Sequence, residues 1–146
     1  MALKLYYSIF LENSGFGTQI NATFVSGGDV DIDRDDTSRQ FILPGLGDSS
    51  NFSFFYEDSF VTARVALNTR GETVAGFGNY DQPLYVEERN QWDLSLALNV
   101  AEDAVVFYEV QNVNDEPTRL YARYQEMLFL SQDHGPIHRL GFRYKF

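Results

Sequence analysis

The sequence contains no cysteine, which excludes a disulfide scaffold, a thiolate metal site and a cysteine nucleophile. It also lacks any apolar run of about eighteen residues, the length that a membrane-spanning helix needs. Basic residues are few, because 11 Lys and Arg stand against 21 Asp and Glu and give a formal net charge of −10. This balance argues against nucleic-acid binding, which requires a basic surface to displace counterions from phosphates.

Aromatic residues, in contrast, are abundant. They make up 16% of the 146 residues, with 13 Phe, 9 Tyr and 1 Trp. A chain of this length fits one domain, and its core does not need so many rings. Such a content is typical of a ligand groove or of a protein that lies at a membrane interface.

Apolar residues alternate with polar residues along seven stretches of the chain. Neighbouring side chains of a β-strand point to opposite faces, so this alternation predicts strands with one apolar face and one polar face. No pattern of helical period competes with it, and we predict an all-β chain. The predicted strands lie at residues 3–11, 19–24, 51–56, 61–70, 92–99, 106–111 and 139–146.

The connections between these strands alternate between short and long. Short connections are predicted near residues 12–15, 57–59 and 100–103, and long ones over 26–49, 71–90 and 114–137. Short turns at one edge and long loops at the other are typical of outer-membrane barrels. A soluble up-and-down barrel rarely carries several loops of this length. We therefore expect antiparallel, up-and-down transmembrane β-barrel strands.

Alternation alone does not tell whether the apolar face meets a protein core or lipid. The positions of the rings favour lipid, because a row of aromatic residues beside the short turns is typical of an interfacial girdle. These rings are Phe10, Phe16, Tyr56, Phe60, Tyr144 and Phe146. The polar positions are varied and hydrophilic, which fits a wide lumen. We expect Arg64, Arg70 and Asp93 to face this lumen. There the arginines either pair with an acid of a neighbouring strand, for which Asp93 is a candidate, or contact a plug domain or an anionic substrate.

The last eight residues, 139–146, read RLGFRYKF. Arg139, Gly141, Tyr144 and Phe146 resemble the insertion signal of bacterial outer-membrane proteins, which the barrel-assembly machinery reads. In physical terms the octet is a strand with one row of rings, able to pair with an assembly template by β-augmentation.

Several stretches, taken in order, resemble the TonB-dependent outer-membrane receptors. Residues 14–25 read SGFGTQINATFV and are similar to the SGFG-x-Q-x-N-x-T hairpin of that family. The segments 43–46 (LPGL), 52–57 and 60–70 are similar to its LPGLS…YYE…FSARLAYNYR segment. The segments 91–95 (QWDLS) and 106–117 are similar to its QLDLSASY…LFLEVLNLTNEP stretch, and 140–146 (LGFRYKF) to its LGVRYKF ending.

This resemblance covers nearly the whole chain but only the C-terminal third of such a receptor. It implies that residues 1–146 are the last seven strands of a 22-stranded barrel, without the plug domain. The complete protein is then expected to take up a siderophore, cobalamin or oligosaccharide across the Gram-negative outer membrane. Its implied partners are outer-membrane lipid, the barrel-assembly machinery, the rest of the barrel and plug, and, through the plug, the TonB complex.

Two other functions stay open at this point. An eighth strand within residues 120–130 would close a stand-alone small outer-membrane barrel with a structural or adhesive role. A soluble β-domain with an aromatic ligand groove is the third possibility. We do not expect an enzyme, because no serine lies in a nucleophile motif such as Gly-x-Ser-x-Gly.

Candidate site residues outside the strands are few. Tyr80, Tyr85, Tyr121 and Tyr124 lie in or near the long loops, where a receptor of this family captures its ligand. The acidic run from Asp29 to Asp36 offers oxygen ligands to a cation but departs from the EF-hand pattern, and a solvated loop explains it better. His134 and His138 flank Gly135 and Pro136, which disfavours a helical metal pair. We expect no cofactor and no metal.

Overall fold

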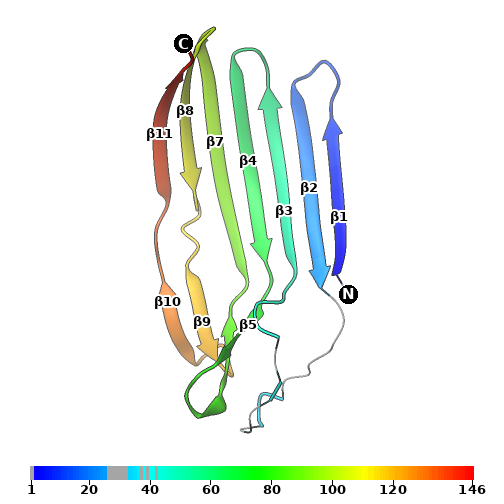
Figure 1. Cartoon of the computed structure of the whole chain (residues 1–146), viewed down its shortest axis with the longest axis vertical. Coiled ribbons are helices and arrows are strands. Elements are labelled where there is room, and N and C mark those ends of the chain that lie inside the picture. The colour runs from blue at the N-terminus through cyan, green and yellow to red at the C-terminus, as the bar shows by residue number, and fades with distance from the viewer. Residues whose placement is uncertain (1, 26–32, 37, 39, 42) are drawn as a thin grey trace.

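The computed structural model describes residues 2–25, 33–36, 38, 40–41 and 43–146. Every strand pairs antiparallel with its neighbours, so the prediction of an all-β, antiparallel chain is confirmed. The larger sheet has seven strands in the order in which the chain makes them (Figure 1). They are β1 (Ala2–Phe10), β2 (Phe16–Val25), β3 (Ser49–Glu57), β4 (Val61–Arg70), β7 (Arg89–Ala101), β8 (Ala104–Gln111) and β11 (Ile137–Tyr144).

A smaller sheet continues the larger one at the end away from the short turns (Figure 1). Its strand order is β10-β9-β6-β5, and each of these strands is next along the chain to the strand in the same place of the order β11-β8-β7-β4 in the larger sheet. Two long hairpins therefore run through both sheets. The smaller sheet consists of β5 (Thr73–Phe77), β6 (Pro83–Val86), β9 (Thr118–Ala122) and β10 (Leu128–Gln132), with the 3-10 turn η1 (Asn79–Asp81) between β5 and β6.

These strands correct two expectations. Residues 71–90 and 114–137 were predicted as loops, but each holds two strands, because short alternating runs there pair with one another across the hairpins. The alternative of an eighth strand within residues 120–130, which would close a small barrel, does not hold either, because this stretch is divided between β9 and β10 of the smaller sheet. It closes no barrel, since β1 and β11 remain the two edges of the larger sheet.

The two sheets are separated where backbone geometry interrupts the hairpins. Asn112 and Asp115 adopt left-handed conformations, with φ of 59° and 53°. The Asn112 side chain accepts a hydrogen bond from the backbone N–H of Glu116 at 2.9 Å, which closes the turn. Pro117 cannot donate to a ladder, and it stands directly before β9.

Neither face of the larger sheet is covered by a second layer among the described residues. Leu140 is 77% exposed and Phe54, on a central strand, is 43% exposed. The buried apolar residues are few, and several of them belong to the smaller sheet: Ala22, Tyr85, Ala104, Val110, Tyr121 and Ala122. Within the described part of the chain no helix is long and apolar enough to cross a membrane.

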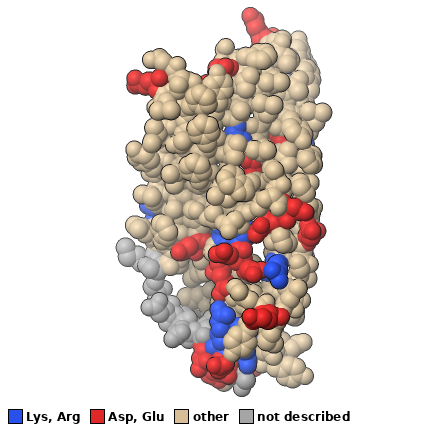
Figure 2. Space-filling model, turned by 180° about the vertical axis from the view of Figure 1, so that it is seen from behind, with Lys and Arg blue, Asp and Glu red and all other residues tan. Residues whose placement is uncertain are grey.

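Charged side chains are distributed unevenly along the long axis. In the view of Figure 2 they gather toward the end of the molecule that holds the smaller sheet, whereas the surface over the larger sheet is mostly uncharged. The junctions between the sheets supply much of this charge, with Glu72, Glu87, Glu88, Glu116 and Asp133 just beyond the ends of the larger sheet's strands.

Candidate functional site

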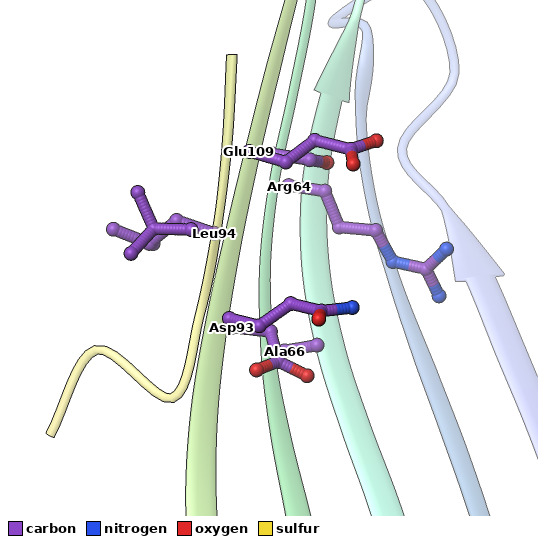
Figure 3. A pocket seen from close by; sticks show the side chains of 8 residues that line it. Arg64, Ala66, Asp93, Leu94 and Glu109 are labelled. Atoms are coloured by element: carbon purple, nitrogen blue, oxygen red, sulfur yellow. The ribbon is translucent and has the colours of Figure 1, made fainter. Parts of the chain in front are cut away.

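The larger sheet separates apolar from charged side chains across all seven strands. The strand registers place one set of apolar residues side by side, here called the apolar face. All Lys, Arg, Asp and Glu side chains of these strands point to the other side, the polar face. Figure 3 shows the division at the centre of the sheet, where Leu94 points away from Arg64, Asp93 and Glu109. The apolar face includes Leu5, Ile20, Phe52, Phe54, Val65, Leu67, Trp92, Leu94, Leu96, Tyr108, Leu140 and Phe142.

Arg64 lies on the polar face, as the alternation predicted, and is held by neutral partners. Its guanidinium donates to Ser53 Oγ at 2.9 Å and to Gln19 Oε1 at 3.1 Å. Gln19 in turn donates to the Tyr6 hydroxyl at 2.9 Å, and Ser53 is fully buried beneath these groups. A chain of hydrogen bonds therefore links β1, β2, β3 and β4 across the polar face.

Asp93 lies on the same face but forms no ion pair with Arg64 or Arg70, so it is not the acidic partner of either arginine. Its carboxylate accepts hydrogen bonds from Asn68 Nδ2 and Gln91 Nε2, both at 2.7 Å, and from the backbone N–H of Asn112 at 2.9 Å. These donors occupy three of the roughly four acceptor positions of the carboxylate. A cavity of about 180 Å³ lies between Arg64, Asp93 and Glu109. Its walls offer a guanidinium and two carboxylates to a small polar molecule.

Arg70 occupies the end of β4 near the smaller sheet. It stands opposite Ser49 on one side and opposite Arg89 on the other. Arg70 and Arg89 thus place two positive charges side by side on the polar face. Like charges in directly facing positions destabilise a sheet. Asp48 and Glu88 line the adjacent cavity of about 200 Å³ and offset these positive charges.

Rings gather on the apolar face beside the short turns. Phe16 packs against Phe54 and Tyr56, with ring centroids 5.6 and 4.8 Å apart. On β11 and beyond it Tyr144 contacts Phe146, with centroids 5.7 Å apart, and Phe146 is fully exposed. The predicted terminal signal thus presents its aromatic residues on the apolar face.

The two other members of that signal lie on the polar face. A Cβ on Gly141 would come within 2.1 Å of the Phe107 ring, so the ring lies flat over this glycine. Gly17 has the same relation to Phe55, at 2.4 Å. Gly141 therefore has a packing role in the folded sheet. Arg139 forms an ion pair with Glu109 at 3.8 Å.

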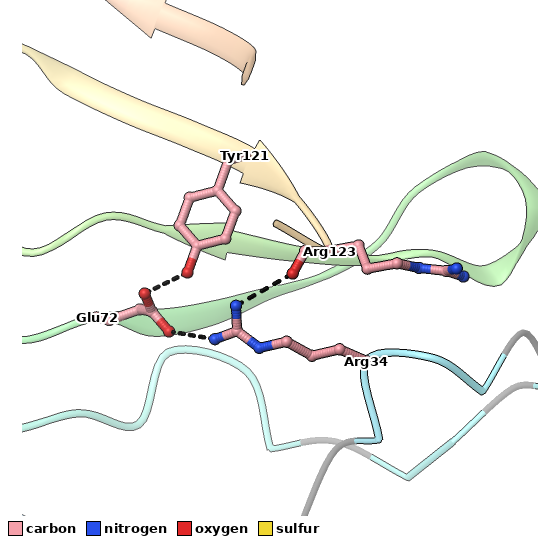
Figure 4. A network of polar contacts seen from close by, with 4 residues as sticks. All are labelled: Arg34, Glu72, Tyr121 and Arg123. Carbon is pink, nitrogen blue, oxygen red and sulfur yellow. Dashed lines mark hydrogen bonds and ion pairs between the residues drawn. The ribbon is translucent and has the colours of Figure 1, made fainter. Parts of the chain in front are cut away.

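The smaller sheet carries a compact cluster that sequence reasoning missed. Tyr85 and Tyr121 are cross-strand partners, and their rings stack with centroids 5.2 Å apart. The Arg34 guanidinium lies over Tyr85, 4.6 Å from the ring centroid, and is 3.2 Å from Glu72 Oε1. It also donates to the Arg123 carbonyl at 3.1 Å, and the Tyr121 hydroxyl donates to the other oxygen of Glu72 (Figure 4). Arg34 lies within the acidic run from Asp29 to Asp36, for which the sequence indicates only a solvated loop.

Burial and charge shift the ionisation of this cluster. Burial raises the pKa of Tyr121 to about 12, with a further contribution from the hydrogen bond to the Glu72 carboxylate. Burial also raises the pKa of Tyr85, although the positive charge of Arg34 opposes the rise. Burial opposes the charge on Arg34, but the Tyr121 phenol and the Glu72 carboxylate outweigh it and raise the pKa of Arg34.

The tyrosines predicted as ligand contacts lie in different settings. Tyr85 and Tyr121 are 5% and 2% exposed, in strands rather than loops, because they form the stack beneath Arg34. Tyr80 is 89% exposed and has a left-handed backbone in η1. Tyr124 is partly exposed, and its hydroxyl donates to Asp35. Only Tyr80 and Tyr124 present a ring edge to a molecule in solution.

The acidic run and the histidines form no metal centre among the described residues. Asp29 and Asp31 lie outside those residues. Asp33 accepts the backbone N–H of Asp35, and hydrogen bonds from the Ser38 backbone and hydroxyl lower the pKa of Asp36. His138 lies on the apolar face, where its Nδ1 is 2.8 Å from the Tyr108 hydroxyl.

No family model, curated protein or solved structure matches the chain.

Proposed function

We propose that the larger sheet is part of the wall of a transmembrane β-barrel, and that the complete protein is an uptake receptor of the TonB-dependent type in the Gram-negative outer membrane. One observation carries the proposal: an apolar face without a formal charge runs across seven antiparallel strands, and no described part of the chain covers it. A water-soluble sheet with such a face would expose a patch far larger than monomeric proteins tolerate.

The dimensions of the apolar face support lipid as its partner. On β7 the apolar positions run from Trp92 to Leu98, which spans about 20 Å at the usual rise of a strand. The apolar band of an outer-membrane barrel is about 25 Å tall and is flanked by aromatic residues. The cluster around Phe16 and Tyr56 occupies the corresponding place beside the short turns.

The two open edges support a segment of a larger barrel rather than a complete small one. An unpaired backbone group costs several kcal/mol in lipid, so β1 and β11 need further strands beside them. Each step across the sheet reverses direction, and β1 and β11 therefore run the same way. An antiparallel barrel then needs an odd number of additional strands, a condition that a 22-stranded receptor meets.

In this proposal the polar face lines the lumen. Arg64, Arg70 and Asp93 lie there, beside cavities that a polar ligand or a plug domain would fill. A siderophore, cobalamin or oligosaccharide is the expected class of cargo, by resemblance to the family. Transport requires the plug and its TonB partner, so this segment supplies the wall, the loops and the terminal strand for the assembly machinery.

Detergent dependence tests the proposal. The chain is purified from inclusion bodies, refolded with and without dodecyl maltoside, and compared by size-exclusion chromatography and circular dichroism. We expect β-rich structure only with detergent, because detergent covers the apolar face. A monodisperse, folded species in plain buffer would contradict the proposal and favour a soluble β-domain.

A further inference from the structure

The cluster of the smaller sheet has the form of a receptor for a guanidinium group. The central carbon of the Arg34 guanidinium lies over the Tyr85 ring, 4.6 Å from its centroid. Its terminal nitrogens reach Glu72 and the Arg123 carbonyl at 3.2 and 3.1 Å (Figure 4). A planar cation is thus recognised on its face by a ring and along its edge by oxygens. A lysine ammonium lacks the planar fork of donors and therefore matches this arrangement less well.

The groups that hold the guanidinium are fixed without Arg34. Tyr85 and Tyr121 stack as cross-strand partners in β6 and β9, and the Tyr121 hydroxyl binds Glu72 independently of the loop. Arg123 has a left-handed backbone, with φ of 61°, and its N–H donates to the Pro83 carbonyl at 3.0 Å. That geometry presents the Arg123 carbonyl to the cluster. Tyr85, Tyr121, Glu72 and the Arg123 carbonyl are here called the cradle.

The occupant, in contrast, reaches the cradle from a segment outside the smaller sheet. Arg34 belongs to residues 33–36, which form no strand, and its side chain is 39% exposed. The neighbouring contact of this segment with the smaller sheet is the exposed hydrogen bond from Tyr124 to Asp35. Because more than a third of the Arg34 side chain is exposed, a ligand in solution can approach the contacts that it makes with the cradle.

We propose that the cradle is a binding site for guanidinium-bearing cations and that Arg34 is its exchangeable intrachain occupant. A ligand with an arginine-like group takes the place of Arg34 over Tyr85 and releases residues 33–36 from the smaller sheet. The formal charge of −10 favours the approach of such a cation. This site does not depend on whether the larger sheet lies in a membrane.

The test uses arginine amide as the probe and lysine amide as its matched control. The full chain, labelled with 3-fluorotyrosine, is titrated in detergent, and the fluorine signals of Tyr85 and Tyr121 are assigned by Tyr→Phe substitution. Arg34→Ala vacates the cradle, so we expect saturable binding of arginine amide in the millimolar range and at least five-fold weaker binding of lysine amide. Arg70→Ala, which removes the same charge but leaves Arg34 in place, should show no saturation in that range.

Adding Glu72→Gln to Arg34→Ala should abolish the preference for arginine amide. The unaltered chain provides a measurement without any substitution, in which tens of millimolar arginine amide, but not lysine amide, should shift the Tyr85 signal by competition. Absence of that competition, or equal binding to the Arg34→Ala and Arg70→Ala chains, would overturn the proposal. Equal binding of arginine amide and lysine amide would mean that the site attracts cations in general. That result would also overturn the proposal.

Discussion

The two sheets share one strand order but are stabilised in different ways. The larger sheet exposes both faces and keeps its charges on one of them. The smaller sheet buries the Tyr85–Tyr121 stack and binds a loop through Arg34. Because the same hairpins pass through both, the difference comes from side chains and not from topology. The hairpins therefore pass from a sheet with one uncharged face to a sheet that packs the charged side chains of Arg34 and Glu72 against its tyrosines.

The largest expected effect concerns the apolar face. Leu94→Arg places a charge on that face, whereas Ser95→Arg places the same charge one residue along β7 on the polar face. We expect Leu94→Arg to lower the free energy of unfolding in lipid bicelles by about 2–4 kcal/mol and Ser95→Arg by much less. Denaturant titration followed by circular dichroism measures both. Equal effects would remove the distinction between the faces.

A second prediction concerns packing on the polar face. Gly141→Ala forces the Phe107 ring to move, since the added Cβ lies within 2.1 Å of it. Overpacking of this kind costs about 1–3 kcal/mol of unfolding free energy. In a Phe107→Ala background the same substitution should cost little, and the double-mutant cycle gives the coupling. No coupling would show that Gly141 is required for something other than packing.

A third prediction separates the two sheets by local stability. Glu72→Gln removes the ion pair with Arg34 and weakens the bond from Tyr121, at an expected cost of about 1 kcal/mol. The loss should accelerate amide hydrogen exchange in β5, β6 and β9 and leave β3, β4 and β7 unchanged. Uniform acceleration across both sheets would mean that they unfold as one unit.

The smallest effect is the ionisation of Tyr121. Its pKa of about 12 in the folded chain lies above the ordinary value of 10.0, because burial and the Glu72 hydrogen bond favour the neutral phenol. The raised pKa of Tyr121 stabilises the folded chain by its full amount below pH 10, and this contribution is lost as the pH rises through about 12. Ultraviolet titration of the chain against its Tyr121→Phe variant isolates the late phenolate. With Glu72→Gln the phenolate should form at lower pH, and an unchanged titration would exclude Glu72 as a cause.

Much of the larger sheet could be predicted from the sequence, because period-two alternation is long and regular there. Leu94, Leu96 and Leu98 on one parity and Asp93 and Ser95 on the other determine both the strand and its two faces. The short turns were also predictable, since they leave no room for another element between strands. Register and strand order then follow from consecutive hairpins.

The smaller sheet could not be predicted in the same way. Its strands are four or five residues long, and β5 and β9 pair with bulges or with distant partners, so alternation has too few positions to be recognised. The Arg34 contact joins residues far apart in sequence and has no local signal. Asp93 was assigned to the correct face but to the wrong partner, because alternation specifies direction and not which of several polar neighbours is nearest.

The central claim is that the apolar face meets lipid, and Trp92 tests it most directly. Trp92 is the only tryptophan, and it lies on that face with 39% of its surface exposed. The chain in bicelles with brominated lipid is compared with a Trp92→Phe, Ser95→Trp variant, whose indole lies on the polar face. We predict strong bromine quenching of Trp92 and weak quenching of the indole at position 95. Equal quenching, or none at Trp92, would contradict the account.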